Sequence, residues 1–216
     1  MLRHQINLRV THHPGYLVLG VLFLLLSGCS GTAPVKEDTA APAVSNNPAL
    51  NKEFERAVSV MRSGDRKRAF RLFTDITKKY PGYAGAHVNI GLAWLNARKY
   101  EKAHDSFKKA LAINTKNAVA YNGLGVVYRQ QGKFKEAEDA YLQALSIDSN
   151  YAIAHLNIGI LNDIYFDQPA KALTHYQEYT KNTQNADKRV AKWIIDVQRR
   201  SKTSPTSTKI SRGGKK

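Results

Sequence analysis

The stretch that decides the fold runs from Ala118 to Asn150 and reads AVAYNGLGVVYRQQGKFKEAEDAYLQALSIDSN. Apolar residues recur at helical spacing on both sides of Gly132, which indicates two helices joined by a glycine turn. Gly125 and Ala137 are small enough to let the two helices approach closely, while Tyr141 is large enough to fill the space beside them. The stretch therefore predicts a helix–turn–helix unit.

The same pattern recurs at a period of about 34 residues on both sides of this stretch. The equivalent positions upstream hold His87, Ile90, Gly91, Trp94, Tyr100, Ala103, Phe107 and Ala110, and before them Ala57, Gly64, Ala69, Phe73 and Pro81. Downstream they hold His155, Ile158 and Gly159, and then Ala172, Tyr176 and Tyr179 if one residue is inserted in the turn. The chain closely resembles the tetratricopeptide repeat family, with four repeats at 50–83, 84–117, 118–151 and 152–186.

This resemblance implies an all-α fold, a right-handed α-solenoid of four helix pairs whose first helices line a concave groove. We expect first helices at about 51–63, 85–97, 119–131 and 153–165. The positions that face the groove in this family correspond here to Phe54, Val58, Val88, Asn89, Leu92, Asn96, Asn122, Val126, Arg129, Leu156, Asn157 and Ile160. The aliphatic members would bury partner side chains and the asparagines would pair with peptide amides, although asparagine is also common in this family without a ligand.

From Ala186 onward the sequence no longer follows the repeat pattern. Val190, Trp193, Ile194 and Val197 fall at amphipathic helical spacing, which predicts a helix over 187–200 that caps the open end of the repeats. A helix lying on a membrane surface is the alternative, because its polar face is basic. Residues 201–216 are polar and cationic and are predicted to be a disordered tail, either simply solvated or attracted to anionic lipid, lipopolysaccharide or cell-wall polymers.

The N-terminal segment has the pattern of an export signal. Arg3 and Arg9 precede a ten-residue apolar run at 17–26, which is too short to be a permanent membrane span. The following Leu-Ser-Gly-Cys resembles the lipobox of bacterial lipoproteins, which implies that residues 1–28 are removed and that Cys29 carries the lipid. An ordinary signal peptide and an uncleaved anchor are the alternatives. Residues 29–49 would be a flexible linker. Ser30 follows the cysteine in place of the aspartate that commonly retains such lipoproteins in the inner membrane, so the resemblance implies the periplasmic face of the outer membrane.

Composition narrows the function classes further. The 216 residues carry a formal net charge of +16, and residues 186–216 hold ten Lys or Arg against two Asp. The single cysteine, Cys29, excludes a disulfide framework. His87 and His155 occupy packing positions, and His104 and His175 have no partners at metal-ligand spacing, so no metal site is expected. Because no catalytic or cofactor motif occurs, the sequence predicts a protein that is not an enzyme and needs no cofactor.

The leading hypothesis is a non-catalytic, lipid-anchored adaptor that binds a segment of another envelope protein. Lipoproteins with these repeats include pilotins for pilus secretins, subunits of barrel-assembly machines and regulators of cell-wall hydrolases. The C-terminal segment also resembles repeat proteins of TonB-type systems, and the sequence does not choose among these machines. The alternative is a polyanion or cell-wall binder that acts through its basic C-terminal end. Nucleic acid is disfavoured as a partner because the chain carries an export signal.

Overall fold

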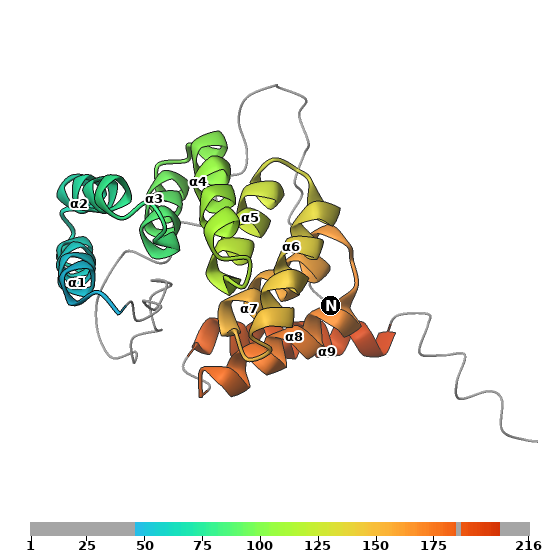
Figure 1. The fold of residues 1–216 in the computed structure, drawn as a ribbon. Coiled ribbons are helices and arrows are strands. Elements are labelled where there is room, and N and C mark those ends of the chain that lie inside the picture. Colours follow the sequence, from blue (N-terminus) through green and yellow to red (C-terminus); the bar gives the residue numbers. More distant parts are fainter. Residues whose placement is uncertain (1–45, 185–186, 204–216) are drawn as a thin grey trace, which may run out of the picture. The chain divides into compact units, whose positions relative to one another are not determined.

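The computed structural model describes residues 46–184 and 187–203, which form nine α-helices, one π-helical segment and no strand (Figure 1). The elements are α1 Pro48–Arg62, α2 Arg66–Lys79, α3 Ala84–Asn96, α4 Tyr100–Ile113, α5 Ala118–Gln130, α6 Phe134–Ile147, α7 Ala152–Ile160, η2 Leu161–Tyr165, α8 Pro169–Asn182 and α9 Lys188–Thr203. This part of the chain confirms the all-α fold expected from the repeat pattern.

The helices pack in consecutive pairs, α1 with α2, α3 with α4, α5 with α6 and α7 with α8. Each second helix also packs against the first helix of the next pair, and first helices touch directly, α3 with α5 and α5 with α7. Side chains cap several of the helices that follow a turn. The Asn47 carboxamide oxygen accepts from the amides of Ala49 and Leu50, and Asp65 accepts from Arg68 at 3.0 Å.

Small residues set the distance between paired helices. A Cβ atom added to Gly125 would lie 2.4 Å from the ring of Tyr141, and one added to Gly159 would lie 2.5 Å from Tyr176. The Phe107 ring lies between two such glycines, Gly91 of its own pair and Gly123 of the next. The aromatic rings therefore fill space that only glycine leaves open, as the sequence pattern predicted.

The turn inside each repeat requires one residue in the left-handed region of backbone conformation. Gly64 (φ 90°) and Gly132 (φ 76°) supply it in the first and third repeats. Arg98 (φ 56°) and Asp167 (φ 48°) adopt the same region in the second and fourth, where a side chain makes it less favourable. The turn geometry is thus retained even where the sequence lacks the glycine.

The extra residue of the fourth repeat is not in the turn, and that detail of the sequence prediction is wrong. The first helix of this repeat switches at Leu161 to the π-helical segment η2, in which the amide of Phe166 donates to the carbonyl of Leu161 at 3.2 Å. A π-turn takes up one more residue than an α-turn. The insertion is therefore absorbed within the helix, and the turn after it keeps its usual geometry.

Helix α9 caps the last helix pair. Val190 and Val197 are fully buried, and the Trp193 ring lies 5.7 Å from that of Tyr176, between centroids. The Arg200 guanidinium, held by Asp196 at 3.0 Å, also pairs with Asp163 of η2. The apolar face of α9 is covered by the protein, as expected of a cap.

Candidate binding surface

The predicted groove residues lie on first helices, which pack more tightly than the sequence pattern suggested. Of the twelve, seven are buried: Phe54, Val58, Val88, Asn89, Asn122, Asn157 and Ile160. These seven side chains are therefore largely covered by the protein instead of exposed on a groove. Phe54 shows the reason, since its ring packs against Phe73 and Tyr83 with centroids 5.6 and 5.2 Å apart.

The three asparagines make internal hydrogen bonds instead of facing a partner. The Asn157 amide nitrogen donates to the Asn122 carboxamide oxygen at 2.9 Å, which links α7 to α5 below the surface. The Asn89 amide nitrogen donates to the Gly85 carbonyl of its own helix, also at 2.9 Å. These contacts hold the amide groups of Asn122 and Asn157 within the fold, whereas the buried Asn89 Oδ1 has no hydrogen-bond partner among the described residues.

Five of the predicted residues stay accessible on neighbouring first helices. Leu92 on α3, Val126 on α5 and Leu156 on α7 are half-buried, as is Arg129, and Asn96 is exposed at the end of α3. We call these five residues the first-helix face. Its aliphatic side chains are partly exposed and also pack against the core, and the Asn122–Asn157 contact joins two of its helices. The face therefore combines three aliphatic side chains with one amide and one guanidinium group.

The fourth repeat adds a charged and polar cluster beside α9. The Tyr176 hydroxyl donates to Asp163 at 3.2 Å, and Asp163 also accepts from Arg200. Burial, and after it the Asp163 carboxylate, raise the pKa of Tyr176 above its ordinary value. The cluster ties the capping helix to the last repeat, which is a structural role.

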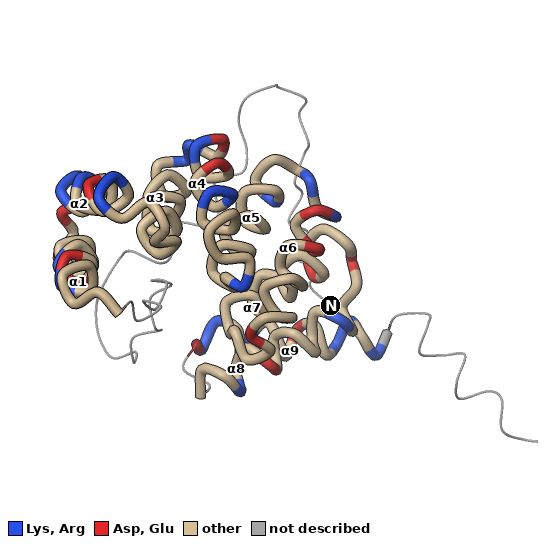
Figure 2. The backbone as a smooth tube through the Cα atoms, in the orientation of Figure 1, with Lys and Arg blue, Asp and Glu red and all other residues tan. Residues whose placement is uncertain are grey.

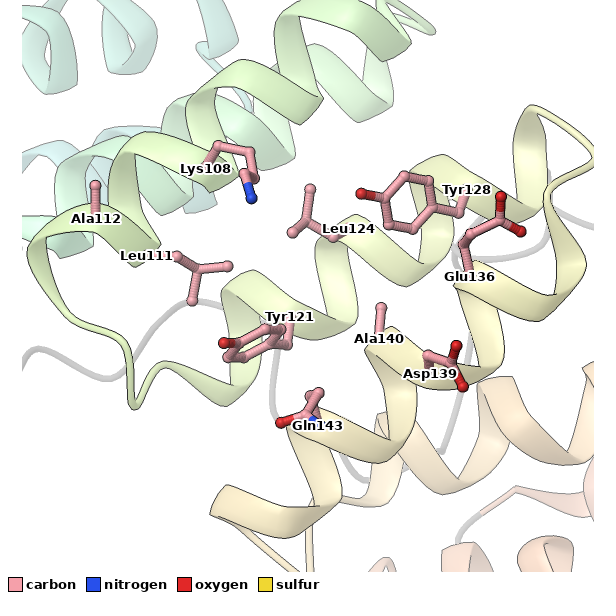
Figure 3. Close-up of a pocket in the computed structure, with 10 residues that line it drawn as sticks. All are labelled: Lys108, Leu111, Ala112, Tyr121, Leu124, Tyr128, Glu136, Asp139, Ala140 and Gln143. Carbon is pink, nitrogen blue, oxygen red and sulfur yellow. The ribbon is translucent and has the colours of Figure 1, made fainter.

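A hollow of about 520 Å³ lies between the second helices α4 and α6 and the first helix α5, at residues that the sequence did not assign to a site (Figure 3). Its walls are Lys108, Leu111 and Ala112 of α4, Tyr121, Leu124 and Tyr128 of α5, and Glu136, Asp139, Ala140 and Gln143 of α6. Tyr121 and Tyr128 reach into it from α5 (Figure 3). An apolar floor with a lysine on one side and two carboxylates on the other could seat one partner side chain.

The structure brings together two histidines that the sequence left apart. The Nδ1 atoms of His155 on α7 and His175 on α8 are 3.1 Å apart, and His155 Nε2 lies 3.0 Å from the Ser149 carbonyl oxygen. His155 must donate through Nε2 to that carbonyl, so its Nδ1 accepts from His175 when both rings are neutral. Burial, and after it the neighbouring His155, lower the pKa of His175 to about 4.

No other metal-ligating side chain joins this pair, and within the described residues no group of three or more His, Cys, Asp or Glu could hold a metal ion. His87 is half-buried, and burial lowers its pKa. His104 contacts the Tyr128 ring, with centroids 5.9 Å apart. The four histidines therefore have packing contacts in this structure.

Cys29, predicted to carry the lipid, lies outside the described residues, as do the rest of the export signal, most of the linker and the basic tail from residue 204. Among the helices that the structure describes, none is sufficiently long and apolar to span a bilayer.

Comparison with known proteins agrees with the repeat pattern. Residues 84–117 and 118–151 each match the tetratricopeptide repeat, and no curated protein matches the chain. Among solved structures, pilF of Pseudomonas aeruginosa is similar with a TM-score of 0.63 at 19% identity, over 78% of each chain. The MamA protein is similar with a TM-score of 0.57 at 20% identity, over 74% of this chain and 86% of that one.

The same helical arrangement also occurs within an enzyme. An O-GlcNAc transferase mutant from Thermobaculum terrenum is similar with a TM-score of 0.57 at 19% identity, but this chain covers only 27% of it. At these identities the likenesses show a tetratricopeptide-repeat fold. The repeats matched at 84–117 and 118–151 suggest a protein-interaction scaffold.

Proposed function

We propose that this protein is a non-catalytic, lipid-anchored scaffold that binds a segment of another cell-envelope protein on its first-helix face. The observation that carries the proposal is the set of half-buried aliphatic side chains of Leu92, Val126 and Leu156 on three neighbouring first helices. Accessible aliphatic residues on a rigid helical surface favour an apolar partner segment. The envelope machine that it serves, whether for a pilus secretin, a TonB-type system or the cell wall, is left open by the chain.

The fold alone does not decide against catalysis, since an O-GlcNAc transferase also contains it. Our proposal of a non-catalytic protein rests on the sequence, in which the repeats and the capping helix use most of the residues after the linker. No nucleophile elbow, phosphate loop or paired-carboxylate motif remains in it. The first-helix face itself offers aliphatic, amide and guanidinium groups, which suit binding.

Affinity capture with matched variants tests the binding surface. We expect Leu92→Ala with Val126→Ala to weaken capture of an envelope protein roughly ten- to a hundredfold, because two apolar contacts would be lost. Leu142→Ala with Ile113→Ala is the control, since these residues are exposed apolar side chains on the second helices α6 and α4. Melting curves must show that both variants are folded. Equal loss in the two variants, or no loss in the first, would reject the first-helix face.

The membrane anchor is a separate part of the proposal. We propose that Cys29 is lipidated after removal of residues 1–28 and holds the protein at the periplasmic face of the outer membrane. Multiple acyl chains give stable anchoring where a single chain is marginal. Cys29→Ala should therefore release the folded protein from envelope membranes in cell fractionation. A mutant that stays with the membranes after a high-salt wash would show that the lipid is not the anchor.

A further inference from the structure

We propose that the outward face of α9 docks this protein against an anionic lipid bilayer. Lys188, Lys192, Ile195, Arg199 and Lys202 are all exposed, and their spacing places them within an arc of about 80° on the helix surface. We call these five residues the α9 stripe. It lies directly opposite Val190 and Val197, which are fully buried in the cap.

The stripe runs along one face of a continuous α-helix, which suits a flat partner. Its first and last residues are 14 positions apart in the chain and therefore roughly 21 Å apart along the helix. Its buried side packs against α8, and the Asp163 contact of Arg200 holds the helix near its C-terminal end. The stripe keeps its orientation when it meets another surface, so little ordering is required for its residues to contact that surface together.

The charged residues around the stripe are mostly basic. Helix α9 and the residue before it hold six Lys or Arg against Asp187 and Asp196, and Figure 2 shows Lys and Arg at both ends of the helix. Both carboxylates are engaged beside the stripe, Asp187 with Arg189 at 2.9 Å and Asp196 with Arg200 at 3.0 Å. The stripe itself therefore contributes four cationic residues and no carboxylate to this face.

Ile195 makes a bilayer a better partner than a soluble polyanion. It lies at the middle of the stripe with 60% of its surface exposed, among the most exposed large apolar residues of the described chain. Cations flanking an aliphatic side chain match the boundary between anionic headgroups and acyl chains, where the charges stay at the surface and the aliphatic group enters. A purely electrostatic partner would gain nothing from an isoleucine there.

This inference rests on the proposed function only for the location of the membrane. Its test needs neither the lipid anchor on Cys29 nor the partner protein. In a Cys29→Ala background, Ile195→Cys gives a chain with a single cysteine, because Cys29 is the only one in the sequence. A polarity-sensitive fluorophore on this cysteine reports whether α9 itself meets lipid, independently of how other segments bind. Leu142→Cys, at a 45% exposed position on α6, carries the same probe as a positional control.

The full-length labelled chains are mixed with vesicles of phosphatidylethanolamine and phosphatidylglycerol, or of phosphatidylethanolamine and phosphatidylcholine. We expect a blue shift at position 195 with the phosphatidylglycerol vesicles only, abolished at high salt, and none at position 142. Adding Lys188→Gln with Lys192→Gln should raise the lipid concentration at half-maximal shift on the order of ten- to thirtyfold. Lys109→Gln with Lys116→Gln removes the same charge from exposed sites on another part of the chain. This control pair should change the lipid concentration at half-maximal shift little.

Several results would overturn the proposal. These are no shift at position 195, an equal shift with the phosphatidylcholine vesicles, or an equal effect of the two lysine pairs in variants whose melting curves are unchanged. A similar shift with soluble dextran sulfate would assign the stripe to soluble polyanions and would also reject the bilayer as its partner.

Discussion

At the scale of single residues, whether a first-helix side chain is exposed or buried depends on the neighbouring helix that it faces. Asn157 and Asn122 occupy first-helix positions at which an exposed amide was expected, yet they meet each other at 2.9 Å in the interior. Their contact joins residues 35 positions apart and fixes two first helices side by side. A binding residue and a structural residue look the same in the sequence at such positions.

Gly125 gives a prediction at this scale. Gly125→Ala should destabilise the protein by about 1–3 kcal/mol, because the new Cβ would lie 2.4 Å from the buried Tyr141 ring. At roughly 2–4 °C per kcal/mol, thermal unfolding should detect the change. The control is Gly82→Ala, where the added Cβ meets nothing within 4 Å. Identical melting temperatures for the two variants would show that the close approach at Gly125 is unimportant for stability.

At the scale of elements, the pairing of α7 with α8 contains a titratable contact. His175 faces His155 of α7, with Glu138 of α6 and with Glu178 and Lys171 of its own helix in its surroundings. Burial favours the neutral ring, and a proton on His175 would also be repelled by the partner histidine if that were charged. Burial of the His175 ring in this helix pair is therefore the main reason that its neutral form is favoured.

This contact predicts a pH dependence with a definite sign. The pKa of His175 is lowered to about 4 in the folded protein, against about 6.5 in an unfolded chain, so the unfolded state binds more protons between these values. Stability is therefore fully present above pH 6.5 and falls as the pH is lowered toward 4. His175→Gln should make the plot of melting temperature against pH shallower in this window. A slope equal to that of the wild type would contradict the assigned role of His175.

At the scale of the whole molecule, the last helix pair of the described repeats has an apolar surface that another element must cover. Helix α9 covers it by burying Val190 and Val197 together with Ala172, Tyr176 and Tyr179 of α8. The same helix presents the α9 stripe to solvent. One element therefore completes the core with one face and leaves the opposite face for the proposed membrane contact.

Removing α9 by truncation tests whether this helix is needed to cover the last pair. A chain that ends at Asp187 should melt at a lower temperature and self-associate in light scattering, because it uncovers the apolar surface of α8. Each aliphatic side chain buried by α9 is worth about 1.5–3 kcal/mol in transfer free energy. A chain that ends at Thr203 retains all of α9 and is the control. If both truncated chains melt alike and stay monomeric, α9 is not a structural cap.

The sequence by itself determined what depends on local periodicity: the helical pairs, their small residues at close contacts and the amphipathic cap, all of which the described structure contains. These follow from 3.6-residue spacing and side-chain volume, which can be read within one repeat. The tertiary structure alone decided which first-helix residues stay accessible, that Asn122 meets Asn157, that His155 meets His175, and that the inserted residue forms a π-turn. The reason is physical: burial and hydrogen bonding between repeats depend on how closely neighbouring helices approach, and contacts 20 to 35 residues apart leave no periodic trace in the chain.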